Sequence, residues 1–277
     1  MMNDKNIILL ISFVSEIYND KNMEEYTVFK KRFIIASFIG KYINEHFIES
    51  ISTEKLMAEW VLFVNKKNEL VDIYTRLSVN LGAQNETIVD LGSGIGIWQY
   101  LGAKSRKIIA VDSNESVINF NKLLWNTFEE IENTNIQHKV ICKYISPTDS
   151  ELINELKAED ISCLICIGVL HELPFSIKIF LDQIQSILKP NAKIIIGDIV
   201  VNKFWGLIRD LIHNFRVNEV ELYYSKYRLS NELHSRFTIN EEWVNKVSKI
   251  PHGINGKSSY WMNIKPDYYS SISTVKT

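Results

Sequence analysis

The first 85 residues show apolar positions at steps of three and four, the spacing that puts side chains on one face of a helix. One such stripe predicts a helix from about residue 24 to 47 and consists of Phe29, Phe33, Ile34, Phe38, Ile39 and Ile43. A second stripe predicts the next helix and consists of Leu56, Trp60, Phe63 and Val64. Because no strand-like alternation and no proline occur here, we expect residues 1–85 to form a helical N-terminal region.

From residue 86 onward, short apolar runs rich in β-branched residues alternate with helical patterns, which is typical of buried parallel strands in an α/β sheet. The runs predict strands at residues 87–91, 108–111, 139–145, 161–167 and 193–200. A helix capped by Ser113 or Asn114 is predicted from the apolar residues Val117, Phe120, Leu123 and Leu124. Another helix covers residues 176–188 and ends before Pro190. The polar turn at residues 81–85 marks the boundary between residues 1–85 and 86–277.

The last quarter of the chain contains an insertion at about residues 201–237 with many aromatic side chains. The insertion holds Trp205, Phe215, Tyr223, Tyr224 and Tyr227, together with Arg228. Thr238-Ile-Asn-Glu241 has the sequence of a capping box and predicts a helix through about residue 247. Last strands are predicted at residues 250–254 and 258–264, and the polar end at 270–277 is expected to fray.

Composition and charge narrow the class of protein. With 277 residues and 46% hydrophobic content, the chain can bury a large core. The net charge of −2 gives no reason to expect a nucleic acid or another polyanion as partner. The densest basic cluster, residues 30–32, is expected to be a solvated helix face instead of a nucleic-acid contact.

The longest early apolar run and the cysteines add further limits. Residues 7–14 are too few to span a bilayer and lack the cleavage site of a signal peptide, so we expect a cytoplasmic protein without membrane contact. Cys163 and Cys166 have the C-x-x-C spacing of metal or redox sites. On a strand, however, residues three apart point to opposite faces, and no second Cys or His pair completes a ligand set. We therefore expect buried strand residues and no metal.

Three glycines follow the first predicted strand and carry the candidate chemistry. Gly92, Gly94 and Gly96 allow a tight turn and let a ligand lie against the backbone, next to the unpaired N–H groups of a helix. The next strand ends at Asp112, whose carboxylate would lie at the same edge of the sheet and accept both hydroxyls of a ribose. A dinucleotide site would need its last glycine at position 97, where this chain has Ile97.

The run Asp90-Leu-Gly-Ser-Gly-Ile-Gly96, followed by Val111-Asp112, resembles the first two motifs of the class I S-adenosylmethionine-dependent methyltransferases. Residues 161–174 resemble the fourth strand and following loop of that family, and residues 187–198 resemble its passage into the fifth strand. The resemblance implies a Rossmann-like, doubly wound α/β sheet that is mostly parallel, with an antiparallel last strand. It also implies S-adenosyl-L-methionine as cofactor.

The resemblance assigns site residues position by position. The implied cofactor-binding residues are Asp90, Gly92, Ser93, Gly94, Gly96, Asp112, Ser113, Ser146, Gly168 and Val169. The glycines would hold the amino-acid part of the cofactor, Asp90 would orient that part, and Asp112 would hold the ribose. The alternative is that these glycines and acids serve only a turn and a helix cap. Many family members carry an acid or amide where this chain has Gly168, so we expect a backbone contact there.

The catalytic assignment concerns the loop after the fourth predicted strand. His171 titrates near neutral pH and is a candidate general base, with Glu172 as the second candidate. A histidine at this place in similar proteins is also often structural, hydrogen-bonded beneath the cofactor. Both interpretations stay open.

The family resemblance does not specify the methyl acceptor, so the substrate class is inferred from other features of the sequence. No Asn-Pro-Pro-Tyr or Asp-Pro-Pro-Tyr sequence follows the fourth strand, so a nucleic-acid substrate is disfavoured. We expect a small-molecule substrate, such as a natural-product precursor, with a protein or peptide substrate or a silent binding subunit as alternatives. Residues 1–85 would cap the active site or form a homodimer, and residues 201–237 would be a lid or a packed accessory helix pair.

Overall fold

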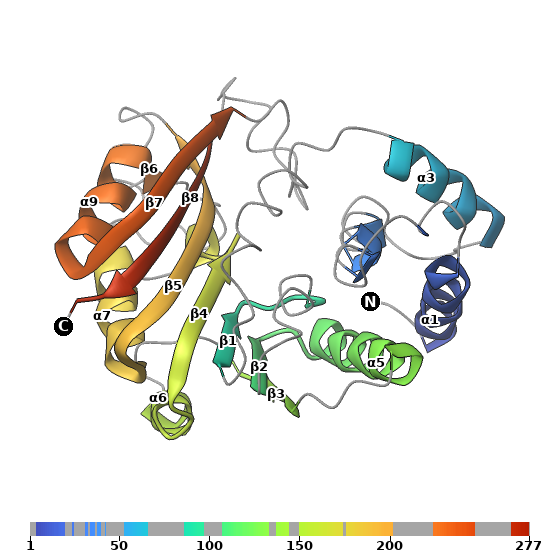
Figure 1. Ribbon diagram of the computed structural model, residues 1–277, viewed down its shortest axis with the longest axis horizontal. Helices are drawn as coiled ribbons and strands as arrows, with labels where there is room; N and C mark the ends of the chain where they lie inside the picture. Colours follow the sequence, from blue (N-terminus) through green and yellow to red (C-terminus); the bar gives the residue numbers. More distant parts are fainter. Residues whose placement is uncertain are drawn as a thin grey trace. The chain divides into compact units, whose positions relative to one another are not determined.

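We analysed a computed structural model of the chain (Figure 1). The structure describes residues 4–19, 24, 31–32, 34–36, 38–39, 42, 53–65, 86–96, 107–132, 137–143, 150–173, 176–201, 224–246 and 267–276. Within these ranges, no helix is both long and apolar enough to cross a membrane.

The elements form an α/β fold. The helices are α1 (Asp4–Tyr18), α3 (Thr53–Asn65), α5 (Glu115–Glu132), α6 (Ser150–Lys157), the 3₁₀ helix η3 (Leu170–Glu172), α7 (Ile177–Ile187) and α9 (Lys226–Arg236). The strands are β1 (Thr87–Leu91), β2 (Lys107–Asp112), β3 (Gln137–Cys142), β4 (Ile161–Ile167), β5 (Leu188–Val201), β6 (Tyr224–Ser225), β7 (Phe237–Lys246) and β8 (Asp267–Val275). The strand order is β3-β2-β1-β4-β5-β8-β7, with β6 beside β5. Within each unit the described strand pairs are parallel except those of β8, which runs antiparallel to β5 and β7, so the predicted Rossmann-like sheet is confirmed.

The chain divides into two compact units. The first unit comprises residues 1–86 and 93–144, and the second comprises residues 87–92 and 145–277. We describe each by itself.

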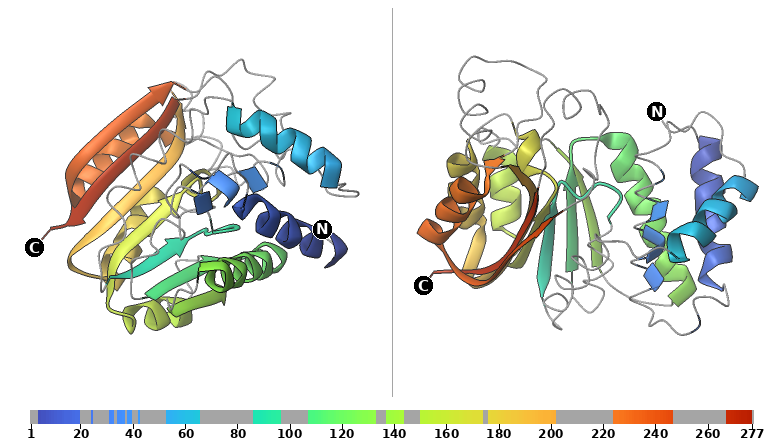
Figure 2. Two further views of the ribbon diagram at one scale, coloured as in Figure 1. Left: turned by 45° about the vertical axis from the view of Figure 1, so that its right-hand side comes forward. Right: turned by 90° about the horizontal axis from the view of Figure 1, so that it is seen from above.

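In the first unit, α5 lies between α1 on one side and the parallel pair β2 and β3 on the other (Figure 2). Asn114 caps α5, since its Oδ1 accepts the N–H of Val117 at 3.2 Å, as predicted. Phe120 and Leu124 are buried as expected, but Leu123 is 43% exposed. The buried positions Trp125 and Phe128 take its place on the apolar face.

The N-terminal helices bury an arginine that the sequence placed on a solvated face. Arg32 is fully buried and forms an ion pair with Glu132 at the end of α5, so the expectation for residues 30–32 is wrong at this position. The Arg32 guanidinium also lies 5.6 Å from the ring centroids of Trp125 and Phe128. Tyr18 donates to the Glu132 carboxylate, and burial followed by this hydrogen bond raises the pKa of the phenol. A buried cation therefore joins the N-terminal helices to α5.

The helical prediction for the N-terminal region holds where the structure describes it. The described residues between 31 and 42 are helical, and α3 covers the second predicted helix. Phe38 packs against Phe13 and Trp60, with ring centroids 5.6 and 5.3 Å apart. Leu56 is likewise buried, as its place in the apolar stripe predicts.

In the second unit, β1, β4 and β5 are parallel neighbours, and β8 continues the sheet between β5 and β7 (Figure 1). β4 has the predicted bounds, and Cys163 and Cys166 are buried in it, which confirms the strand interpretation of the C-x-x-C spacing. The β5 strand begins at Leu188, earlier than the predicted residue 193, so Pro190 lies inside the strand.

The C-terminal predictions were wrong for two segments. Residues 238–247 were expected to be helical, but β7 covers Phe237–Lys246 and pairs with β8 along its length. The polar end was expected to fray, but Ser270, Ser271 and Ser273 are buried in β8. Backbone pairing on both sides of β8 outweighs the local capping signal and the polar composition. The strands predicted at residues 250–254 and 258–264 lie outside the described residues.

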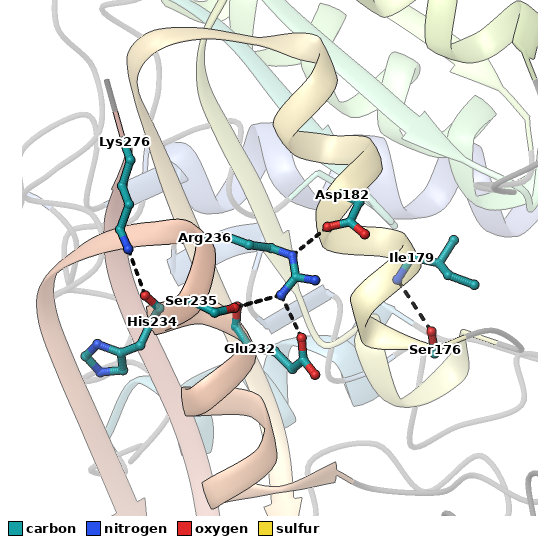
Figure 3. Close-up of polar contacts among 8 residues, drawn as sticks. All are labelled: Ser176, Ile179, Asp182, Glu232, His234, Ser235, Arg236 and Lys276. Atoms are coloured by element: carbon teal, nitrogen blue, oxygen red, sulfur yellow. Dashed lines mark hydrogen bonds and ion pairs between the residues drawn. The ribbon is translucent and has the colours of Figure 1, made fainter.

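Part of the predicted insertion at residues 201–237 forms α9, which packs against α7. Arg236 at the end of α9 pairs with Asp182 of α7 at 2.7 Å and with Glu232 at 2.6 Å (Figure 3). This contact fits the accessory-helix interpretation for residues 226–236. Residues 202–223 lie outside the described residues, and the lid interpretation stays a prediction.

Candidate functional site

The glycine loop leaves β1 in a tight turn. Ser93 N donates to Val111 O at 3.0 Å, and Gly96 N donates to Ser93 O at 2.9 Å. Gly94 has a φ of +52°, and no heavy atom of the described residues lies within 4 Å of the place that a Cβ would take. Among the described residues, the space beside the Cα of Gly94 is therefore open and leaves room for a ligand.

At Gly92 and Gly96, in contrast to Gly94, a Cβ would collide with a neighbouring side chain. A Cβ at Gly92 would lie 2.2 Å from Val169 Cγ2, within the second unit. A Cβ at Gly96 would lie 2.8 Å from Asn121 Oδ1, within the first unit. These two glycines allow close packing of the loop, which agrees with the turn interpretation for them.

Asp112 ends β2 and holds the loop at Gly94. Its Oδ2 accepts the Gly94 N–H at 2.8 Å, and its Oδ1 accepts the Asn114 N–H at 2.9 Å. The side chain is only partly buried, and an ionised carboxylate offers about four acceptor sites. Acceptor capacity therefore remains for hydroxyl groups of a ligand. Ser113, the next residue, is exposed.

Asn121 is a residue of the first unit that sequence reasoning missed. It is fully buried on α5, and its Nδ2 donates to Gly94 O at 3.1 Å. The N–H of Gly94 is bound by Asp112 and its carbonyl by Asn121, so both sides of this residue are fixed. The sequence signal that could have identified Asn121 is an amide between Phe120 and Leu124 on the buried face of a helix, because a buried amide needs hydrogen-bond partners.

In the second unit, Asp90 of β1 and Asp198 of β5 are buried acids on the two strands that flank β4. Both are 1% exposed, and Asp90 lies opposite Ile165 of β4. Burial, followed by the charges of Asp198 and Asp90, raises the pKa of the Cys166 thiol well above its usual value. Cys166 is therefore a buried thiol without nucleophilic character.

The turn after β4 begins at Gly168. Gly168 has a φ of +71°, and no described residue has a heavy atom within 4 Å of the place of its missing Cβ. Its N–H donates to Gly197 O of β5 at 2.7 Å. Like Gly94, Gly168 leaves open the space where a Cβ would lie. It follows the end of a parallel strand, where ligands of doubly wound sheets bind.

His171 lies in η3 and is 4% exposed. Its Nδ1 is 2.7 Å from Asp198 Oδ1. Because a carboxylate only accepts, Nδ1 carries the hydrogen, and in the neutral ring Nε2 is then the acceptor. Sequence reasoning did not single out Asp198, although it is the one acid in the otherwise apolar run of residues 194–201. Glu172 ends η3, and the structure does not describe its side chain.

The predicted site residues fall into two groups. The first unit holds Ser93, Gly94, Gly96, Asp112 and Ser113. The second unit holds Asp90, Gly92, Gly168, Val169, His171 and Glu172. Ser146 lies outside the described residues. Among the described residues, no group of three or more His, Cys, Asp and Glu side chains is arranged to hold a metal ion.

The geometry of each group fits an adenosine-type cofactor. The open backbone of Gly94 and Gly168 leaves room for a ligand, and the partly exposed Asp112 carboxylate has acceptor capacity for a ribose.

Comparison with known proteins agrees with this chemistry. A family model described as a methyltransferase domain matches residues 62–240. A Bacillus halodurans C-125 protein assigned as a methyltransferase has a similar fold, with a TM-score of 0.53 and 14% identity over 74% of this chain and 100% of that chain. No curated protein matches the sequence significantly.

Two further solved structures have lower scores. A SAM-dependent methyltransferase from Methanosarcina mazei has a TM-score of 0.49 and 15% identity over 76% of this chain and 99% of that chain. The N-methyltransferase NodS from Bradyrhizobium japonicum WM9 has a TM-score of 0.48 and 13% identity over 76% of this chain and 96% of that chain. At these identities, structural similarity concerns the fold alone.

Proposed function

Because this chain belongs to the methyltransferase-domain family, and is a class I enzyme with S-adenosylmethionine as cofactor, we propose that its methyl acceptor is a small molecule. Three features support this substrate class. The net charge is −2, no Asn-Pro-Pro-Tyr or Asp-Pro-Pro-Tyr sequence follows β4, and the predicted insertion at 201–237 is rich in aromatic residues. A protein or peptide acceptor is the alternative that the experiment must separate.

The observation that carries the cofactor assignment is the pair of Gly94 and Asp112. In this proposal the open Gly94 backbone lies against the amino-acid part of the cofactor, and Asp112 accepts the ribose hydroxyls. Ser93 and Gly96 shape the loop, and Ser113 flanks the ribose. Ser146 is proposed for the adenine side.

The second group of residues holds the reacting end of the cofactor. Asp90 orients the amino-acid part through its amine or a water molecule, while Gly92 lets Val169 approach the loop. Gly168 and Val169 contact the cofactor through their backbone.

The bound cofactor supplies a methyl group on a sulfonium centre, and the protein mainly positions the acceptor in line with it. A base is needed only where the acceptor must lose a proton. His171 would serve through Nε2, since Nδ1 faces Asp198. Glu172 is the second candidate.

We also propose that the enzyme is cytoplasmic and forms a homodimer through its N-terminal helices. Ile8 on α1 is 65% exposed and Leu62 on α3 is 60% exposed, and a second copy that packs on these helices would cover both apolar side chains. Sedimentation of the wild type and of the double variant Ile8→Lys/Leu62→Lys tests this. A monomeric wild type would contradict the dimer.

The function is tested first by calorimetric titration with S-adenosylmethionine and S-adenosylhomocysteine, then by transfer of labelled methyl groups. Micromolar cofactor binding and label in the small-molecule fraction of a cell extract would support the proposal. Label in the protein fraction would favour the alternative, and binding without transfer to either fraction would indicate a silent binding subunit.

A further inference from the structure

Asp198 is a buried carboxylate within β5 that accepts several hydrogen bonds. Its Oδ2 accepts the backbone N–H groups of Leu170 at 2.6 Å and His171 at 3.3 Å. Its Oδ1 accepts from His171 Nδ1 at 2.7 Å and from Ile199 N at 2.6 Å. Four N–H donors thus meet about four acceptor sites, and the side chain is 1% exposed. No acceptor capacity remains for a cofactor or substrate.

Three of these four bonds end in one short turn. η3 begins after Val169, whose side chain has no acceptor that could cap the first N–H groups of the turn. Asp198 supplies that acceptor from the neighbouring strand. Together with the bond from Gly168 N to Gly197 O, it ties the turn to β5 at both its beginning and its middle.

The same carboxylate fixes the imidazole of His171. Since Asp198 accepts from Nδ1, it selects the tautomer with the hydrogen on Nδ1. The orientation of the ring and the backbone of residues 168–172 therefore depend on one buried side chain. An uncompensated loss of this acceptor would leave several buried N–H groups without a partner.

We propose that Asp198 is a positioning residue of this enzyme, which holds the turn Gly168–Glu172 and the Nδ1–H tautomer of His171 in the form that the cofactor meets. The inference rests on the proposed function, because it takes Gly168 and Val169 as cofactor contacts. Asp198 itself touches neither cofactor nor acceptor.

The first test uses the wild-type protein and needs no cofactor. Long-range ¹H–¹⁵N correlation spectra of uniformly labelled protein, recorded at mildly alkaline pH, report the tautomer of each of the six histidines. A His171→Gln variant assigns the signal by its loss. We expect Nδ1 of His171 to carry the hydrogen. A predominant Nε2–H form in the wild type would overturn the inference.

The second test is Asp198→Asn, compared with Asp182→Asn in the same unit. Asp182 is an exposed acid on α7, and its carboxylate pairs with Arg236 of α9 (Figure 3). Asp198→Asn should lower the affinity for S-adenosylhomocysteine about tenfold or more, the factor expected for losing a buried charged hydrogen-bond acceptor, and should populate the other His171 tautomer. Asp182→Asn should change neither.

The results separate the two proposals. Wild-type cofactor binding with an unchanged affinity and tautomer in Asp198→Asn would reject the role of Asp198 alone. A wild type that binds no cofactor would reject the cofactor assignment, while its tautomer spectrum would still test Asp198. If Asp198→Asn does not fold, the wild-type spectrum decides.

Discussion

Two aspartates near the carboxyl ends of parallel strands each hold a loop that carries predicted site residues, and they differ in exposure and in the number of bonds that they accept. Asp112, in the first unit, is partly exposed and accepts two N–H groups, one of them from Gly94. Asp198, in the second unit, is buried and accepts four. The spare sites of Asp112 can bind a ligand, whereas Asp198 can only shape the protein.

The comparison shows that the position of an acid at a strand end does not define its role. What distinguishes the two acids is the balance between acceptor sites and local donors, together with access to solvent. Removing Asp112 should therefore affect binding more than folding. Removing Asp198 should affect the geometry of a whole turn.

The largest effect is expected from Gly94→Arg, which tests whether the loop held by Asp112 faces the cofactor. The arginine would fill the open space at Gly94 and would have to adopt a φ of +52°. Calorimetry should show the loss of binding to S-adenosylhomocysteine, a change of ~4 kcal/mol or more from micromolar affinity. Asn126→Arg, on the exposed face of α5, is the control and should bind normally. Normal binding by Gly94→Arg would remove the loop from the site.

Acid should lower the stability of the first unit, which carries Asp112, because β3 contains the partly buried His138. Burial, followed by the charge of Lys122, lowers the pKa of His138 from 6.5 to about 4. Below pH 6.5 the imidazole of His138 is protonated in the unfolded chain, whereas in the folded chain it stays neutral down to about pH 4. The free energy of unfolding therefore falls as pH falls. The full loss is ~3 kcal/mol across this interval.

The measurement compares wild type with His138→Phe, which keeps the stacking on Trp125, where the ring centroids are 4.7 Å apart. Urea unfolding at several pH values between 6.5 and 4 should show a steeper decline in the wild type. Parallel curves for the two proteins would contradict the titration of His138. Hydrogen exchange, compared between the two proteins at each pH, should show that β2 and β3 lose protection before β4 and β5.

Asp112→Ala should weaken cofactor binding by ~1.5–3 kcal/mol, the scale of hydrogen bonds to a charged group. The variant also removes the acceptor of the Gly94 N–H, so part of the lost binding free energy comes from a less ordered loop. Glu130→Ala, an exposed acid on α5, serves as control. An affinity equal to that of the wild type would refute the ribose assignment and leave Asp112 with a structural role like that of Asp198.

The smallest effect is expected for Asp182, an exposed acid that serves as the reference for Asp112 and Asp198. Its side chain is 54% exposed, and its ion pair with Arg236 joins α7 to α9 at the surface (Figure 3). Asp182→Ala should lower the free energy of unfolding by less than ~1 kcal/mol and leave cofactor binding unchanged. A larger loss in chemical denaturation would show that exposure alone does not rank these acids.

The sequence predicted those parts of the fold whose signal is local. Residues 87–91 and 161–167 are buried on both faces, so their continuous apolar runs identified β1 and β4. The glycine loop and Asp112 were found through spacing and family resemblance. Asn121 and Asp198 were missed, because their partners Gly94 and His171 lie 27 residues away in the chain and meet them only in the fold.

The errors have a similar origin. The capping sequence at Thr238 and the polar residues of β8 describe what a short segment would do alone. In the fold, β8 pairs on both sides, with β5 and β7, and buries small hydroxyl side chains such as Ser271. The structure of these segments depends on pairing between residues that lie 21 or more positions apart in the chain, and no local pattern reports such pairing.

The place of β8 between β5 and β7 also bears on how the protein is made. The ribosome produces both neighbours before β8, so during translation the growing chain carries two strand edges whose partner does not yet exist. Unpaired edges attract other chains, and nascent chains on one messenger are close together. Pairing of β8 with both neighbours thus closes two edges that would otherwise be open to intermolecular pairing.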